Sequence, residues 1–195
     1  MKSNLVLASG SKIRADLLNK AGFKFDIVKS TIDERNIKEI NDSEYMAKIL
    51  AFSKANEVSN RYKNSLIIGC DQILEFENNI LHKVNTIEEA KQRIINFNGK
   101  EHFLYSAIVL VKNNIKKCEI IKKTRLKMYN LTSQEIKNYI EKTTIDIVNS
   151  VSCYQIENLG INLFEEIEGN IYDIMGLPLF ELIRYLKKYN YSGLR

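Results

Sequence analysis

The stretch that decides the fold is Leu5-Val6-Leu7-Ala8-Ser9-Gly10-Ser11-Lys12-Ile13-Arg14-Ala15-Asp16-Leu17-Leu18. Its four leading apolar residues predict a short buried strand, and the small residues 9–11 predict a tight turn. Apolar side chains then recur through residues 12–21 and predict a helix. The first N–H groups of a helix have no partner within it, so a strand, turn and helix in this order form a natural anion site.

Two positively charged side chains lie at the N-terminus of the predicted helix, where cations are unfavourable. Lys12 and Arg14 lie in the predicted first turn, where the helix dipole is already positive. A local rule broken in this way points to a compensating anion. We interpret the anion as a phosphate, with the hydroxyls of Ser9 and Ser11 donating to its oxygens. The alternative is a solvated basic helix start behind an ordinary serine cap.

The composition predicts a globular protein with an anionic ligand. The chain has 195 residues, of which 45% are hydrophobic, with one proline and a net charge of +5. This size fits one domain, residues 1–195, with two lobes at most. The basic residues are spread along the chain without a basic and aromatic array, so we expect no nucleic-acid partner.

The cysteines and the apolar runs bear on where the protein resides. Cys70, Cys118 and Cys153 are odd in number, far apart and outside any Cys/His cluster, which disfavours a zinc site and favours free thiols in a reducing cytosol. Residues 5–8 are too short for a signal peptide, and no run has transmembrane length. We expect a cytoplasmic protein without a membrane partner.

Strands and helices alternate early, and a hairpin precedes the last helices. This order favours an α/β fold with a mixed sheet. The helices are marked by an Asp42 cap, by capping boxes at Thr86–Glu89 and Thr132–Glu135, and by the turn 176–178. The predicted strands are 5–8, 25–28, 66–74, 102–111 and 115–128, and the predicted helices are 12–21, 43–61, 87–97, one from 133 and one from 179.

Two charged side chains interrupt apolar patterns. Asp71 follows Gly69 in the buried strand 66–74, where a carboxylate costs several kcal/mol unless it is paired or functional. Lys54 lies between Leu50 and Val58 on the helix 43–61. A structurally paired aspartate and a lysine that reaches outward to solvent are the alternatives to a functional role.

The pattern Ala8-Ser9-x-Ser11-x-x-Arg14, followed by Leu17-Leu18, resembles the N-terminal signature of the Maf family of nucleotide pyrophosphatases. Lys12 and Ile13 stand where that family has Pro and its first Arg. Further similar stretches follow in order over nearly the whole chain: Ala51–Val58, Gly69–Asp71, Cys153–Gly160 and Met175–Pro178.

The resemblance implies a Maf/ITPase-like fold, with an elongated, twisted, mixed sheet, flanking helices and two lobes around a nucleotide cleft. It implies hydrolysis of a nucleoside triphosphate to the monophosphate and pyrophosphate, and often a homodimer. It also implies a divalent cofactor, Mg²⁺ or Mn²⁺, which would neutralise charge on the leaving pyrophosphate.

The resemblance also assigns residues to roles. Asp71 matches the family's catalytic acid and would orient or deprotonate the attacking water. Glu34 would hold the metal with Asp71, although by itself the pair Asp33-Glu34 is typical of a solvated loop. The substrate-binding residues would be Ser9, Ser11, Arg14, Lys54 and Lys83. Around Lys83 the family has Gly and Pro where this chain has His82 and Val84, which leaves the loop shape open.

Three positions differ between substrate subgroups of the family, and they correspond here to Ile13, Gln72 and Glu157. Gln72 and Glu157 match the 7-methyl-GTP subgroup, and Ile13 matches neither subgroup. A carboxylate accepts the adjacent N1–H and N2 amino donors of guanine and repels the carbonyls of uracil or thymine. We therefore expect a guanine-type, methylated substrate; the alternative for Glu157 is a strand-end residue that faces water.

Two other functions stay open from the sequence. One is a dTTP and UTP pyrophosphatase of the same family. The other is a non-catalytic nucleotide-binding regulator of cell division, because the family is also associated with division arrest.

Overall fold

The computed structural model describes residues 4–34, 37, 41–143, 147–148 and 150–194. Its strands are β1 (Leu5–Ala8), β2 (Asp26–Ile27), β3 (Leu66–Phe76), β4 (Asn79–Leu81), β5 (Glu101–Lys112), β6 (Ile115–Met128) and β7 (Phe164–Glu168). Its helices are α1 (Lys12–Lys20), α2 (Ser43–Arg61), α3 (Ile87–Phe97), α4 (Ser133–Thr143), α5 (Ile171–Ile174) and α6 (Leu179–Lys188), with a 3₁₀ helix η3 (Leu159–Leu163).

The strands form one mixed sheet in the order β2-β1-β3-β5-β6-β7, and β4 pairs with β3. β1 runs parallel to β2 and to β3, and the remaining pairs are antiparallel. The predicted mixed α/β fold is confirmed. The short strand β4 was not predicted, because only three residues follow the tight turn at residues 77–78 before the pattern ends.

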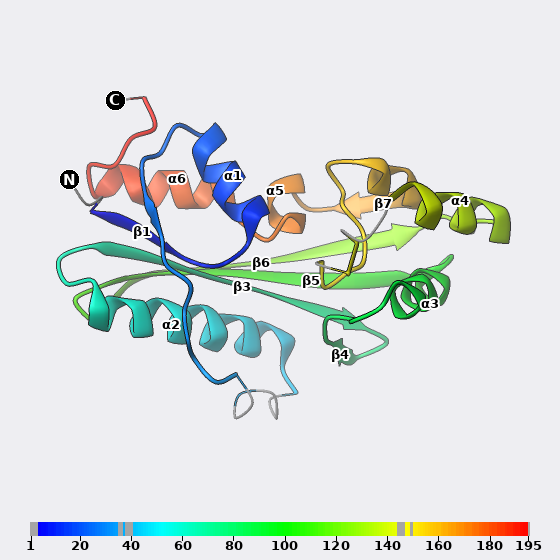
Figure 1. The fold of residues 1–195 in the computed structure, drawn as a ribbon, viewed down its shortest axis with the longest axis horizontal. Helices are drawn as coiled ribbons and strands as arrows, with labels where there is room; N and C mark the ends of the chain where they lie inside the picture. The colour runs from blue at the N-terminus through cyan, green and yellow to red at the C-terminus, as the bar shows by residue number, and fades with distance from the viewer. Residues whose placement is uncertain (1–3, 35–36, 38–40, 144–146, 149, 195) are drawn as a thin grey trace.

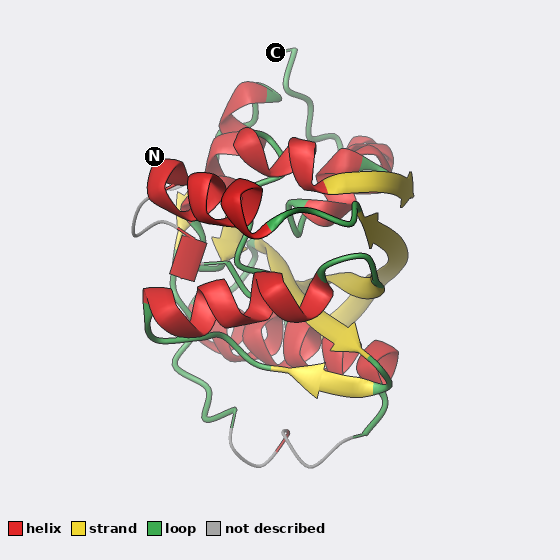
Figure 2. Ribbon diagram, turned by 90° about the vertical axis from the view of Figure 1, so that its right-hand side faces the viewer, coloured by secondary structure: helices red, strands yellow, loops and turns green. Residues whose placement is uncertain are grey.

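Helices cover the elongated sheet on both faces, as Figure 1 and the end view in Figure 2 show. One face packs against α2 through a core that includes Val6, Ile67 and Val109. The opposite face carries α1 and α6 at one end of the sheet and α3 and α4 at the other end, each pair over its own apolar core. These two groups of helices form two lobes on this face of the sheet.

Local capping explains where the helices begin. The hydroxyl of Ser11 accepts a hydrogen bond from the N–H of Arg14, and Asp42 caps α2 in the same way. Thr86 and Glu89 form both hydrogen bonds of a capping box at α3. The sequence predicts each of these starts, because a capping contact joins residues only three positions apart.

β3 has a free edge in the middle of the sheet. On this edge β1 pairs with β3 as far as Gly69, and the pairing of β3 with β4 begins at Leu74. Residues 70–73 of β3 therefore pair only with β5 among the described strands. The helices α1 and α2, which follow β1 and β2, lie on opposite faces of the sheet (Figure 1). Such a switch point at the carboxyl end of parallel strands is where α/β sheets bind ligands.

A glycine lets α2 approach β3 closely at this edge. A Cβ atom on Gly69 would lie 2.1 Å from the carbonyl oxygen of Ala51 and 2.7 Å from Cβ of Ala55. Both distances are far below van der Waals contact, so only glycine fits here. The contact places the α2 turn that carries Lys54 directly over the free edge.

The three cysteines are buried and free, as predicted. Among the described helices, none combines the length and the apolar character needed to cross a bilayer.

We predict that Gly69→Ala destabilises the fold by about 3 kcal/mol, because α2 must move away from β3 to admit the methyl group. Urea unfolding measures the change. The matched control is Gly10→Ala, whose new Cβ would lie 3.5 Å from Cδ of Lys29, an ordinary contact. We expect the control to change stability by less than about 0.5 kcal/mol. Equal stability of both variants would contradict the packing argument.

Candidate active site

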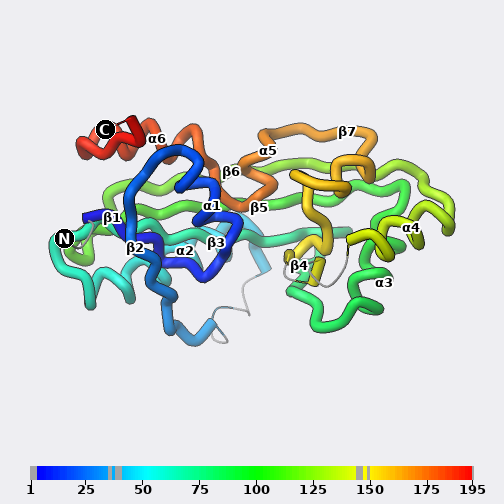
Figure 3. Tube along the Cα trace, turned by 45° about the horizontal axis from the view of Figure 1, so that its top comes forward, coloured from blue at the N-terminus to red at the C-terminus, as the bar shows by residue number. Residues whose placement is uncertain are grey.

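A cavity of about 870 Å³ opens at the free edge of β3, between the two lobes. The segment that follows α4, drawn from yellow to orange in Figure 3, forms its far wall with residues 150–157. All ten residues singled out from the sequence line this one cavity: Ser9, Ser11, Ile13, Arg14, Glu34, Lys54, Asp71, Gln72, Lys83 and Glu157. The structure therefore brings together residues that the sequence separates by up to 148 positions (157 − 9).

The turn before α1 is ordered by its own hydroxyls. Ser9 Oγ accepts from the N–H of Ser11 at 3.2 Å, and Ser11 Oγ accepts from the N–H of Arg14 at 3.4 Å. Each hydroxyl keeps its own proton to donate. The turn and the helix N-terminus thus present hydroxyl donors to the cavity.

Arg14 is fixed by three protein oxygens. Its Nη1 donates to Ser9 Oγ at 3.3 Å and to the carbonyl of Cys70 at 3.0 Å, and its Nε donates to the carbonyl of Gly176 at 2.9 Å. We expected a bound anion to offset this cation at a helix N-terminus. These acceptors already offset part of the charge of Arg14, so a cation at this helix N-terminus does not by itself require a bound phosphate.

Gly176 leaves room for the guanidinium. Its φ is +81°, and a Cβ there would lie 3.1 Å from Nη2 of Arg14. Both the left-handed backbone and the close approach favour glycine. The sequence predicts a turn at this position, and the structure adds that the turn holds the arginine.

Lys54 joins the two carboxylates of the site. Its Nζ lies 2.9 Å from Oε1 of Glu34 and donates a hydrogen bond to Oδ1 of Asp71. Burial raises the pKa of Asp71 above its ordinary value, although Lys54 and Arg14 oppose the change. The carboxylates also keep the pKa of Lys54 above that of an ordinary lysine, against the effect of burial. The interrupted apolar patterns at Asp71 and Lys54 are thus one ion pair across β3 and α2.

Lys83 faces other cations at the mouth of the cavity. The cavity walls remove part of its water, and together with the charges of Arg14 and Lys54 this lowers its pKa. Lys83, Arg14 and Lys54 together place three positive charges at one end of the cavity and create a positive potential there. That end attracts anions with several negative charges.

The carboxylates suit a divalent cation in part. Glu34 and Asp71 reach one ammonium group from two sides, so a cation between them has two hard oxygen ligands. Within the described residues, no group of three or more His, Cys, Asp and Glu gathers that could hold an ion alone. Mg²⁺ is ordinarily held by one or two carboxylates together with water and substrate phosphates, so the donor set fits such an ion.

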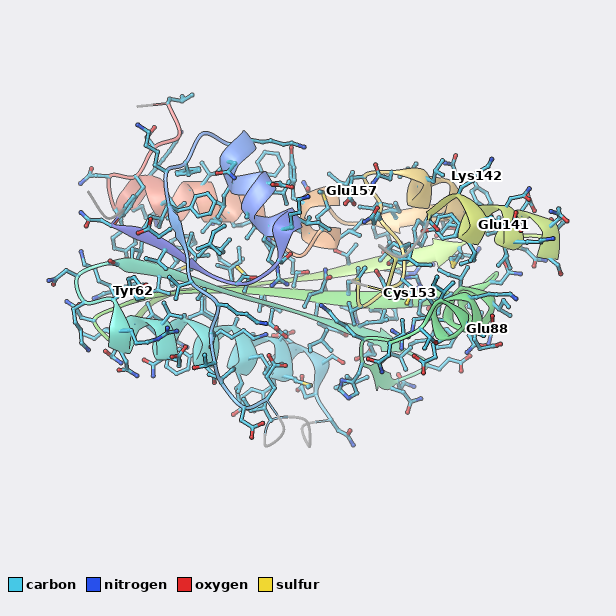
Figure 4. The ribbon with its side chains drawn as sticks, viewed as in Figure 1. Tyr62, Glu88, Glu141, Lys142, Cys153 and Glu157 are labelled. Carbon is cyan, nitrogen blue, oxygen red and sulfur yellow. The ribbon has the colours of Figure 1, made fainter. Side chains whose placement is uncertain are left out.

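The three specificity positions lie in different surroundings. Ile13 is half-buried against the core of α1 and α6. Gln72 lies on the face of β3 opposite Asp71, and its Nε2 bonds with Ser106 and with two carbonyls of α5. Glu157 is exposed and lies above the sheet, on the side of α1 and α5 (Figure 4).

Two further residues that line the cavity, Lys29 and Tyr154, were assigned no role from the sequence. The side chain of Lys29 runs beside Gly10, so its cation belongs to the same turn as Ser9. The position of Lys29 just after β2 could have indicated a place at the site, because the ends of adjacent parallel strands meet at one edge of the sheet. Tyr154 donates to or accepts from the buried His102 at 2.8 Å, a contact between residues 52 positions apart that no local pattern reveals.

Comparison with known proteins gives one family. The family model described as "Maf-like protein" matches residues 4–189. A protein of Bartonella henselae named "7-methyl-GTP pyrophosphatase" is 40% identical over 192 residues, which cover 97% of both chains. A Ruegeria protein named "Nucleoside triphosphate pyrophosphatase" is 34% identical over 95% of this chain and 96% of its own. A Brucella suis "7-methyl-GTP pyrophosphatase" is 36% identical over 96% and 97%.

The matched residues 4–189 include every residue that lines the cavity. With the family model and these relatives covering nearly its whole length, the chain belongs to the family of Maf-like proteins.

Proposed function

We propose that this protein is a nucleoside triphosphate pyrophosphatase that releases pyrophosphate and prefers a guanine-type, N7-methylated substrate. The observation that carries the proposal is the cavity, which joins a cationic end to two carboxylates, the buried Asp71 and the partly exposed Glu34. A cationic end can hold a polyphosphate, and a carboxylate beside it can activate water. The names of relatives at 34–41% identity support the same reaction.

The chain's own groups can hold the triphosphate. Arg14 is fixed by carbonyls and still lines the cavity, so it offers a pre-oriented planar donor. Lys54 and Lys83 add ammonium groups, and the hydroxyls of Ser9 and Ser11 add hydrogen bonds. Holding the phosphates in one geometry lowers the barrier through orientation.

Glu34 and Asp71 would hold the divalent cation, Mg²⁺ or Mn²⁺. When bound, the cation neutralises charge that develops on the leaving pyrophosphate. Lys54 bridges these carboxylates in the structure. Its ammonium group lies within the cavity, where it would contact the phosphates.

Asp71 would act on the attacking water. Burial raises its pKa above the ordinary value, which makes the carboxylate a stronger base than an exposed aspartate. Lys54 keeps the carboxylate oriented through its hydrogen bond. Asp71 thus accepts a proton from water as the oxygen attacks the α-phosphorus, and the pyrophosphate leaves.

Glu157 would recognise the base. Its carboxylate is exposed within the cavity wall, and it can accept two adjacent donors of guanine. The positive charge of an N7-methylated ring adds Coulomb attraction. The relatives named as 7-methyl-GTP pyrophosphatases support this choice.

The test is pyrophosphate release with Mg²⁺ from 7-methyl-GTP, GTP, UTP and dTTP. We expect the highest kcat/KM for a guanine-type substrate. Preference for UTP or dTTP favours the pyrimidine alternative, and tight binding without turnover favours the regulator. A homodimer and a cytoplasmic location stay predictions from the sequence.

We predict that Asp71→Asn lowers turnover by about 10²–10⁴-fold while nucleotide binding is largely retained, because the base is lost and the shape is kept. Steady-state kinetics and calorimetry measure the two quantities. Asp26→Asn, on β2 outside the cavity, is the control and keeps wild-type turnover. Near-normal turnover of Asp71→Asn would exclude Asp71 as the base.

We predict that kcat/KM falls at alkaline pH, starting below the ordinary lysine range of about 10.4. The lowered pKa of Lys83 makes its ammonium lose the proton earlier as pH rises, so the triphosphate binds less well. Lys83→Arg keeps its charge and should lack this early fall, whereas Lys187→Arg on the exposed end of α6 should keep it. Identical pH profiles for wild type and Lys83→Arg would refute the assignment.

We predict that Glu157→Gln reduces the preference for 7-methyl-GTP over UTP by about 1–3 kcal/mol, because an amide offers one acceptor oxygen where the carboxylate offers two. The ratio of kcat/KM values measures the effect. Glu165→Gln, exposed on β7 outside the cavity, leaves the ratio unchanged. An unchanged ratio in Glu157→Gln would remove Glu157 from base recognition.

A further inference from the structure

Gln72 and Ser106 face each other across β3 and β5 and bond to the same short helix. Gln72 Nε2 donates to Ser106 Oγ at 2.8 Å, to the carbonyl of Ile174 at 2.9 Å and to that of Asp173 at 3.1 Å. Ser106 Oγ donates to the carbonyl of Asp173 at 2.7 Å. The sheet is thereby tied to the carbonyl end of α5 by three hydrogen bonds from two side chains.

α5 forms a wall of the cavity. Ile174 and Met175 line it, and the carbonyl of Gly176, which follows, accepts from Arg14. The helix has only four residues, so its own hydrogen bonds cannot define where it stands. The side chains that hold it from the sheet decide its position.

The amide of Gln72 has no N–H group left for a substrate. Its two N–H groups are shared among three protein acceptors, so a base in the cavity finds only the acceptor oxygen of this side chain. Ser106 is 1% exposed and does not line the cavity. A substrate cannot touch it without rearrangement of the wall.

We propose that Gln72 and Ser106 are positioning residues, which set the substrate preference by fixing the α5 wall rather than by contacting the base. The proposal rests on the proposed function, because it concerns the choice between guanine-type and pyrimidine triphosphates. When α5 is held in one position, the cavity binds best the one base whose size and hydrogen-bonding edge fit it. When α5 can move, smaller bases bind with a smaller loss of kcat/KM relative to that base.

Ser106→Ala is the first test, because it removes a hydroxyl that the substrate does not reach. Losing about one net hydrogen bond from the wall should lower the kcat/KM ratio of 7-methyl-GTP to UTP about three- to tenfold. The loss should appear as a higher KM for 7-methyl-GTP at nearly unchanged kcat, since the fit is weakened equally in the ground state and in the transition state. An unchanged ratio would overturn the proposal.

Gln72→Glu and Gln72→Met distinguish positioning from direct contact. The glutamate keeps an acceptor oxygen and loses both N–H donors, and the methionine keeps the length and loses all polar contacts. If the wall matters, both variants lower the ratio. If the acceptor oxygen contacts the base, Gln72→Glu keeps the preference while Gln72→Met loses it, and the proposal fails.

The control is Thr124→Val, which removes a buried hydroxyl on β6, beside Gly169, that has no hydrogen-bond partner among the described residues and so does not tie α5 to the sheet. It should leave the ratio unchanged. Hydrogen exchange of the amides of residues 171–177 supplies a readout independent of activity. Faster exchange in Ser106→Ala than in Thr124→Val supports the tie to the sheet, and equal exchange overturns it.

Failure of the proposed function is separable from failure of this inference. If the wild type hydrolyses no triphosphate, the proposed function fails, and binding of a non-hydrolysable GTP analogue against a UTP analogue replaces the kinetic ratio. A binding ratio that falls in Ser106→Ala, together with faster exchange of residues 171–177, still supports the positioning role. A binding ratio equal to the wild-type value contradicts it.

Discussion

A carboxylate removed from water needs a positive partner, and the pairing of Asp71 with Lys54 meets this need at the centre of the molecule. The pair requires α2 to lie against β3, which Gly69 allows by having no side chain. It also requires a sheet edge without a neighbouring strand, so that the carboxylate faces a cavity instead of a core. The same edge gives Arg14 the carbonyl of Cys70. One electrostatic requirement thus links helix packing, strand length and the shape of the site.

The sequence predicts the features that depend on neighbours along the chain. The strand, turn and helix of residues 5–20 follow from a local pattern, and the caps at Ser11, Asp42 and Thr86 follow from residues three positions apart. Family resemblance adds the ten site residues, which one cavity brings together. Their chemical roles stay predictions, because geometry places groups side by side without showing what they do.

Distant contacts could not be predicted. The partner of Arg14 is a carbonyl 162 positions away, and the carbonyls that bind Gln72 lie 101 and 102 positions away. The sequence does not show which backbone carbonyl a side chain will contact, so we expected both Arg14 and Gln72 to be free to contact a substrate.

The arginine clamp ties the beginning of the chain to its end. A ribosome completes β1 and α1 long before it makes Gly176, and α6, which covers α1, comes later still. Until Gly176 is made, the guanidinium of Arg14 lacks one acceptor that orients it. Until α6 is made, β1 lacks part of the apolar core that covers it. The cationic end of the cavity is therefore incomplete while the protein is being synthesised. An unfinished chain carries every one of the early motifs and yet has no working site to expose to the cell's nucleotide pool.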